Sequence, residues 1–221
     1  MSPPILIYVA AFASVLPALV GLVRLRGLDR GFRILVALFS VDVINIGLQV
    51  MLAFRGINNL WLSHFYGLIE FVLIASVLSS WSGLKWRSNL RLINVLFVVF
   101  WIFAQFFLEP MNESAYFTSL VSKVFYTGFS IILLHKMSGD ASISILRDPR
   151  FWFLSGLLVF ATGGIMFSAL RGVIDKLPLE GLLMAYSIHW GISILTSLIF
   201  SIGFLCKPQL QNSGGRLELA R

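Results

Sequence analysis

Charged residues are scarce in this sequence. Lysine, arginine, aspartate and glutamate make up 12% of its 221 residues, about half the share found in a typical soluble domain. Hydrophobic residues make up 58%, and the mean hydropathy is +0.89. This composition argues against a water-soluble fold and predicts a protein whose outer surface faces the lipid bilayer.

Cysteine and histidine are rare too. The single cysteine, Cys206, excludes an intramolecular disulfide. The three histidines show no His-x-x-x-His spacing, so we expect no tetrahedral metal site and no cofactor. The basic residues are spread over the predicted loops and form no single basic surface, so no nucleic-acid partner is expected. The polar–apolar alternation of barrel strands is missing as well.

Long continuous apolar runs fill most of the chain. A membrane-spanning helix needs about 20 apolar residues, and its backbone groups must be satisfied within the helix. Residues 1–206 therefore predict an all-α, polytopic membrane domain of seven transmembrane helices, followed by a disordered cytoplasmic tail at 207–221. The seven helices are predicted at Pro3–Val23, Ile34–Phe54, Trp61–Trp81, Leu92–Leu108, Tyr116–Leu134, Phe151–Leu170 and Gly181–Cys206.

The basic residues predict how the chain is oriented. Most of the 17 lysines and arginines fall in the first, third and fifth connections and in the tail. Short cytoplasmic loops carry such an excess of positive charge. We therefore expect the N-terminus outside and the C-terminus in the cytoplasm.

Several polar side chains fall inside the apolar runs, where an ionisable group costs several kcal/mol unless it is paired or hydrated. Glu70 lies about 15 Å along its helix from the outer end, near the midplane. Polar residues on each helix recur at offsets of three, four or seven and so share a face. The candidates for ligand binding or proton relay are Asp42, Asn45, Gln49, Tyr66, Glu70, Lys123 and His189.

These residues leave two interpretations open. They could line an outward-opening polar cavity among the second, third, fifth and seventh helices, with Glu70 paired with Lys123 or His189. They could instead form a structural network, because buried polar side chains between membrane helices often only hold a bundle together. His64 lies off the Glu70 face and is predicted to be an interfacial residue.

The sixth predicted helix carries two further signals. Asp148 followed by Pro149 is typical of a helix start. Gly156, Gly164, Ser168 and Gly172 recur at multiples of four and predict a ridge of small residues against which another helix packs closely.

Three stretches carry a resemblance to a known family. They are His64–Phe71, with the pattern His-x-Tyr-x-x-Ile-Glu-Phe; Asp148–Trp152, with Gly156 and Gly163; and Ile188–His189. In these the chain resembles a poorly characterised family of bacterial seven-helix membrane proteins, some of which are linked to sensor histidine kinases. The resemblance implies a multi-pass protein of the bacterial cytoplasmic (inner) membrane. Phe160 stands where the family pattern leads us to expect tyrosine.

The sequence favours a sensory or signalling input module without a catalytic site of its own. Its ligand would be a small molecule or a proton, and its partner a cytoplasmic signalling protein such as a histidine kinase. The alternatives are a membrane-embedded lipid hydrolase and a proton-coupled small-molecule transporter, for which Asp42, Glu70, Lys123 and His189 would form the proton path.

Overall fold

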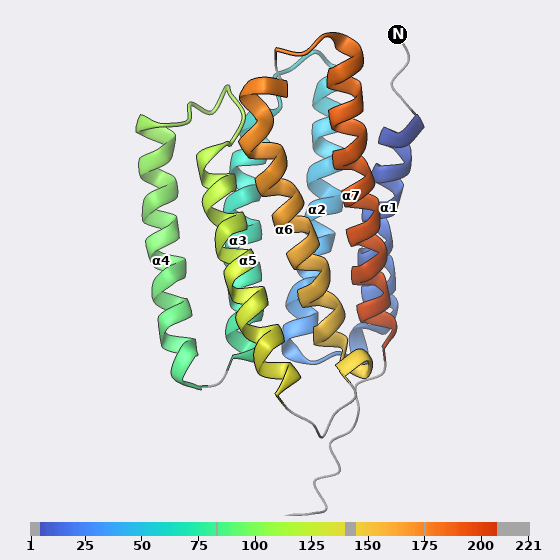
Figure 1. Ribbon diagram of the computed structural model, residues 1–221, viewed down its shortest axis with the longest axis vertical. Coiled ribbons are helices and arrows are strands. Elements are labelled where there is room, and N and C mark those ends of the chain that lie inside the picture. The colour runs from blue at the N-terminus through green and yellow to red at the C-terminus, as the bar shows by residue number, and fades with distance from the viewer. Residues whose placement is uncertain (1–4, 83, 140–144, 175, 207–221) are drawn as a thin grey trace, which may run out of the picture.

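The computed structural model describes residues 5–82, 84–139, 145–174 and 176–206. These residues form seven long helices and two short 3-10 helices, and the described part of the chain contains no strand (Figure 1). The tail predicted at 207–221 lies outside the described residues. The helices are α1 (Ile5–Arg24), α2 (Arg30–Phe54), α3 (Leu60–Trp81), α4 (Leu84–Phe107), α5 (Phe117–Ser138), α6 (Pro149–Ile174) and α7 (Leu179–Leu205), with η1 (Leu25–Gly27) and η2 (Ile145–Arg147).

All seven long helices are long and apolar enough to cross a membrane. They run alternately up and down, so that the start of α1 and the end of α7 lie at opposite ends of the bundle (Figure 1). The predicted all-α fold with seven spanning helices is confirmed. We call the end that holds the α1–α2, α3–α4 and α5–α6 connections the basic end, because most of the arginines lie there. Its cytoplasmic location remains a prediction.

The predicted start of α2 was four residues too late. Arg30 to Arg33 were assigned to a turn, whereas α2 begins at Arg30. Asp29 caps this helix, because its carboxylate accepts a hydrogen bond of 2.9 Å from the Phe32 amide. The cap satisfies an amide that has no partner within the helix, and it allows the helix to begin before the apolar run does.

The predicted start of α4 was also wrong, by eight residues. The stretch from Leu84 to Arg91, which the sequence placed in the connection before this helix, is helical. Hydropathy detects only the part of a helix inside hydrocarbon, whereas the backbone continues as helix where water and headgroups can solvate Arg87 and Arg91. For the same reason α5 and α6 both run four residues beyond their predicted ends, to Ser138 and Ile174.

Six of the helices form a ring and the remaining one lies outside it. α1 packs between α2 and α7, α6 packs between α5 and α7, and α3 lies beside α2. α4 packs chiefly on α3 and stands at the edge of the bundle (Figure 1). Its outer face is apolar, and Phe106 and Phe107 are 80% and 73% exposed. Such a surface fits the lipid solvent that the composition predicts.

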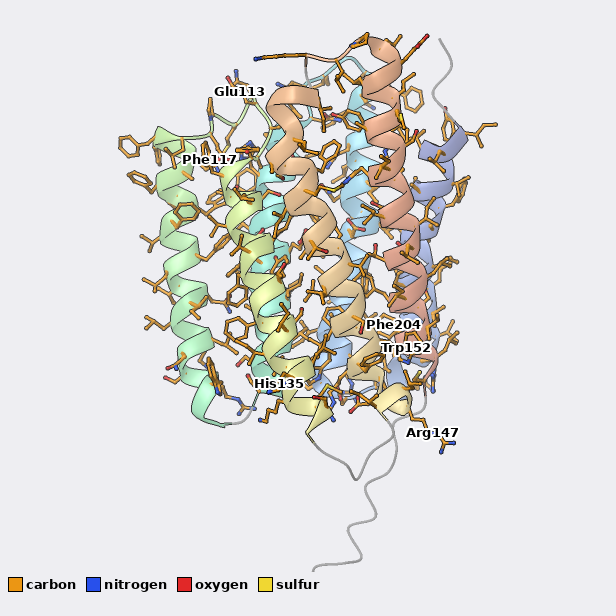
Figure 2. All side chains as sticks on the ribbon, in the orientation of Figure 1. Glu113, Phe117, His135, Arg147, Trp152 and Phe204 are labelled. Carbon is orange, nitrogen blue, oxygen red and sulfur yellow. The ribbon has the colours of Figure 1, made fainter. Side chains whose placement is uncertain are left out.

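An aromatic cluster fills the ring toward the basic end. Phe32 contacts both Trp81 and Phe204, with ring centroids 5.2 and 5.8 Å apart. Phe153 lies 5.4 Å from Trp81 and 5.2 Å from Phe200. Figure 2 shows Phe204 and Trp152 close together at this end of the bundle, where His135 and Arg147 also lie. The members of the aromatic cluster are Phe32, Phe39, Trp81, Phe153, Phe200 and Phe204.

The α4–α5 connection closes the opposite end beside α3. His64 is 1% exposed, and its Nε2 lies 2.9 Å from the carbonyl oxygen of Glu113 in that connection. Trp101 of α4 donates a hydrogen bond of 3.1 Å to the His64 carbonyl. His64 lies one turn into α3, near this end of the bundle, and its side chain is buried against the loop. His64 ties α3 to the loop, a role that depends on residues about 50 positions away in the chain.

The predicted small-residue ridge on α6 contacts two different neighbours. Gly156 lies against Phe200 of α7, whereas Gly164 lies against the side chain of Lys123 on α5. Eight residues turn a helix by about 80° beyond two full turns, so the two glycines face different directions. The residues are close-packing positions, as predicted, but they do not share one partner helix.

Candidate functional site

A cavity of about 500 Å³ lies inside the ring of helices. Residues of α1, α2, α3, α6 and α7 line it, whereas the sequence predicted walls from α2, α3, α5 and α7. Phe39, Phe153 and Phe200 of the aromatic cluster line it as well. The predicted site residues that line it are Asp42, Gln49, Tyr66, Glu70 and His189, joined by Trp190, Ser193 and Thr196.

Two carboxyl groups face this cavity from neighbouring helices. Asp42 lies midway along α2, and Glu70 lies midway along α3. The Tyr66 hydroxyl is a hydrogen-bonding neighbour of Asp42, and the two carboxyl groups are close enough to interact electrostatically. Tyr66 and Glu70 are one helical turn apart, which puts both side chains on the same side of α3.

Asn45 and Gln49 form a local polar pair on α2. The amide of Gln49 donates a hydrogen bond of 3.3 Å to Asn45 Oδ1, and Asn45 is buried. Asn59 donates a hydrogen bond of 2.9 Å to the backbone carbonyl of Gln49 and so ties the start of α3 to α2. Gln49 lines the cavity, whereas Asn45 does not contribute to its lining.

Lys123 is held beside the cavity. Its ammonium donates a hydrogen bond to the Ser119 hydroxyl one turn earlier on α5, and its methylene groups lie against Gly164. Lys123 and Glu70 interact electrostatically. Within the described residues Glu70 forms no ion pair with a basic side chain, since the ion pair there joins Asp148 to Arg150 at 2.6 Å. The expected pairing is therefore an interaction without direct contact.

Tyr126 is a neighbour of Glu70 that the candidate set omitted. Its side chain is 0% exposed, and its hydroxyl faces the Glu70 carboxyl without completing a hydrogen bond of regular geometry. Its ring centroid lies 5.9 Å from that of Phe71. Tyr126 lies on the polar face of α5 that also carries Lys123, three residues earlier, and this spacing is the signal by which the sequence could have identified it.

His189 lies at the boundary between two pockets. It lines the central cavity and also an apolar pocket of about 220 Å³ between α6 and α7. Its ring packs against Phe167 in a tilted arrangement, with centroids 4.7 Å apart. Its Nδ1 is buried and has no hydrogen-bond partner within the described structure. That nitrogen is available to a ligand or a water molecule.

The arrangement favours binding of a polar guest or transfer of a proton. Carboxyl and phenol groups converge on one cavity, and Trp190 and Tyr66 add aromatic faces that attract cations. Among the described residues no three histidine, cysteine, aspartate or glutamate side chains group as metal ligands would. No protein-family model matches the sequence, and neither a curated protein nor a solved structure does.

Proposed function

We propose that the protein is a sensory input module of the membrane whose central cavity binds a small organic cation. The observation that carries the proposal is that Asp42 and Glu70 line one cavity while neither forms an ion pair within the described structure. Lys123 is the ammonium group that interacts with Glu70, so two carboxyl groups at membrane depth share one positive charge, which is costly in a low-dielectric interior. A cationic guest would supply the missing charge.

The residues that line the cavity favour access from the end opposite the basic end. Aromatic residues form its floor on the basic side, where Phe39 and Phe153 both pack against Phe200 with tilted rings. Gln49 and Ile7, which lie nearer the other end of α2 and α1, also line it. With the predicted orientation the cavity would open outward, as expected of a sensor for an external ligand.

The basic end is where a partner would dock. It carries exposed arginines on η1, α2 and α4, including Arg26, Arg30 and Arg87. We infer that this end contacts a cytoplasmic signalling protein such as a histidine kinase, in keeping with the resemblance to the bacterial seven-helix family. The bacterial inner membrane is the location that this role requires.

A proton-coupled transporter is the second candidate. The electrostatic coupling of Asp42, Glu70 and Lys123 around one cavity favours it, because such groups can exchange protons as a guest binds. Transport would also require the aromatic cluster to open, whereas a sensor can keep it closed.

The purified protein tests the proposal with choline, ethanolamine and small polyamines as probes. We expect at least one probe to raise the thermal unfolding temperature. We expect D42N and E70Q each to weaken its affinity by roughly tenfold, as for loss of a charged hydrogen-bonding group. E180Q removes the same charge from an exposed position in the first turn of α7 and is the matched control. Unaltered affinity in D42N and E70Q would refute the cavity as the binding site.

Flux measurements separate the two candidates. The protein is reconstituted in vesicles with the probe that binds, and its uptake is followed with and without a pH gradient. Binding without uptake supports the sensor, and gradient-driven uptake supports the transporter.

A further inference from the structure

A second polar pocket, of about 150 Å³, lies at the basic end among α2, α3 and α4. Arg30 reaches it from the first residue of α2, and Arg87 and Arg91 reach it from the first two turns of α4. Both helices pack on α3, whose residues Ser76 and Ser79 form part of the wall between them. Three guanidinium groups from two helices therefore border one small pocket.

The positive charge of this pocket has no counterpart in the described structure. Among the described residues no carboxylate lines the pocket, and none of its three arginines forms an ion pair. Two acidic residues that the structure describes at this end are engaged elsewhere, since Asp29 caps α2 and Asp148 binds Arg150. Arg87 and Arg91 are four residues apart on one helix face, where like charges repel each other. An anion in the pocket would relieve that repulsion.

The remaining polar groups suit an anion with several acceptor oxygens. Asn94 of α4 lines the pocket, and its amide nitrogen is a donor. The Ser79 hydroxyl is a further donor on the α3 side. Guanidinium groups bind phosphate through two parallel hydrogen bonds, which makes arginine the preferred side chain for phosphate recognition.

The depth of the pocket matches that of a lipid headgroup. Arg30 is the first residue of the membrane-length part of α2, and Trp86 is the first residue of that part of α4. Ser76 lies five residues before the end of α3, or about 8 Å inside it. Exposed Trp86 next to Arg87 is the pairing of aromatic and basic side chains found where hydrocarbon meets headgroups.

We propose that this pocket binds a phosphate group, carried by an anionic phospholipid of the leaflet at the basic end or by a small soluble phosphate. The site is separate from the central cavity, so it stands whether or not the cavity binds a cation. Its ligand would hold the ends of α2 and α4 together across α3.

Native mass spectrometry of the full-length protein in detergent tests the proposal. The probes are phosphatidylglycerol, with phosphatidylcholine as the zwitterionic comparison, and each is added with and without inorganic phosphate. The test variant is R30Q/R87Q/R91Q. The matched control is R26Q/K136Q/R147Q, which removes three positive charges from the same end but from positions that do not line the pocket. R87Q alone is a milder variant, because Arg87 is exposed.

We expect phosphatidylglycerol to bind preferentially and its affinity to fall by roughly tenfold or more in the pocket variant, because charge-assisted hydrogen bonds are lost. The control should stay within about twofold. The affinity of R87Q should lie between those of the pocket variant and the control. If the triple variant does not fold, R87Q is used in its place. Retention of the lipid against inorganic phosphate identifies the lipid as the source, and displacement identifies a soluble phosphate. The proposal would be overturned if phosphatidylcholine bound as tightly as phosphatidylglycerol. It would also be overturned if the control variant lost as much affinity as the pocket variant, or if neither R87Q nor the triple variant lost affinity.

Discussion

Lys123 of α5 packs against Gly164 of α6, and its methylene groups occupy the space that a larger side chain at position 164 would need. The contact directs the ammonium group to Ser119 and keeps it beside Glu70 without an ion pair. A glycine that hydropathy treats as neutral thus positions an ammonium group beside the candidate site.

Replacement of this glycine should destabilise the protein. In G164A the new methyl group would overlap the flexible end of the Lys123 side chain, which must move away and give up its hydrogen bond to Ser119, at a cost of about 1 kcal/mol. G128A on α5 is the matched control, because nothing lies within 4 Å of the Cβ position there. Its effect should be neutral or favourable, since alanine is the better helix former. Thermal unfolding in detergent compares the two, and equal unfolding temperatures would contradict the contact.

The contact between His64 and Glu113 should hold the α4–α5 connection in place. H64F keeps a ring of similar size but removes the hydrogen bond to the Glu113 carbonyl, which should cost about 1 kcal/mol. Amide hydrogen exchange should accelerate in residues 108–116. H135F, at an exposed position at the basic end, should leave that exchange rate unaltered. An unaltered rate in H64F would show that the contact does not order the loop.

Glu109 should stabilise the start of α5. Its buried carboxylate accepts hydrogen bonds from the Thr118 hydroxyl at 2.8 Å and from the Phe117 and Thr118 amides. Figure 2 places Phe117 and Glu113 at the end of the bundle away from the basic end. A carboxylate at a helix N-terminus gains from the helix dipole, so E109Q should lower the free energy of unfolding by about 1–2 kcal/mol. E113Q is the control, because Glu113 makes its contact with His64 through the backbone carbonyl. An equally large drop in the free energy of unfolding of E113Q would argue against the cap.

Arg24 should stabilise the end of α7. Its guanidinium donates hydrogen bonds to the backbone carbonyls of Phe204, at 2.5 Å, and Cys206, at 3.3 Å. A positive charge at a helix C-terminus is favourable by about 0.5–2 kcal/mol. R24Q should therefore unfold at a lower temperature than R26Q, whose exposed side chain makes no such contact in the described structure. Identical unfolding of the two variants would speak against this role.

The orientation of the chain can be tested with reporters. A fluorescent protein that folds only in the cytoplasm should be fluorescent when fused to the C-terminus, and alkaline phosphatase fused there should stay inactive. A reporter inserted after Ile57, in the α2–α3 connection, should give the opposite pattern. The expectation follows from the arginines at the basic end, which lie in the α1–α2 connection and in the first turns of α2 and α4. An active phosphatase at the C-terminus would reverse the proposed direction of the cavity.

The sequence by itself determined the fold class and the number of spanning helices. Continuous apolar runs of membrane length leave the backbone no other way to satisfy its hydrogen bonds. The periodic placement of Asp42, Tyr66 and Glu70 also determined that these side chains point to shared faces. Helix periodicity is local, so spacing along the chain is enough to predict it.

Only the tertiary structure decided which helices meet and where each one begins. The walls of the cavity come from α1 and α6 in place of α5, because lateral packing depends on contacts between residues distant in sequence. Lys123 points to Ser119 because Gly164 leaves room for it, and His64 is buried because Glu113 and Trp101 lie against it. Such contacts leave no local signal in the sequence, whereas each membrane-spanning helix is marked by its own apolar run.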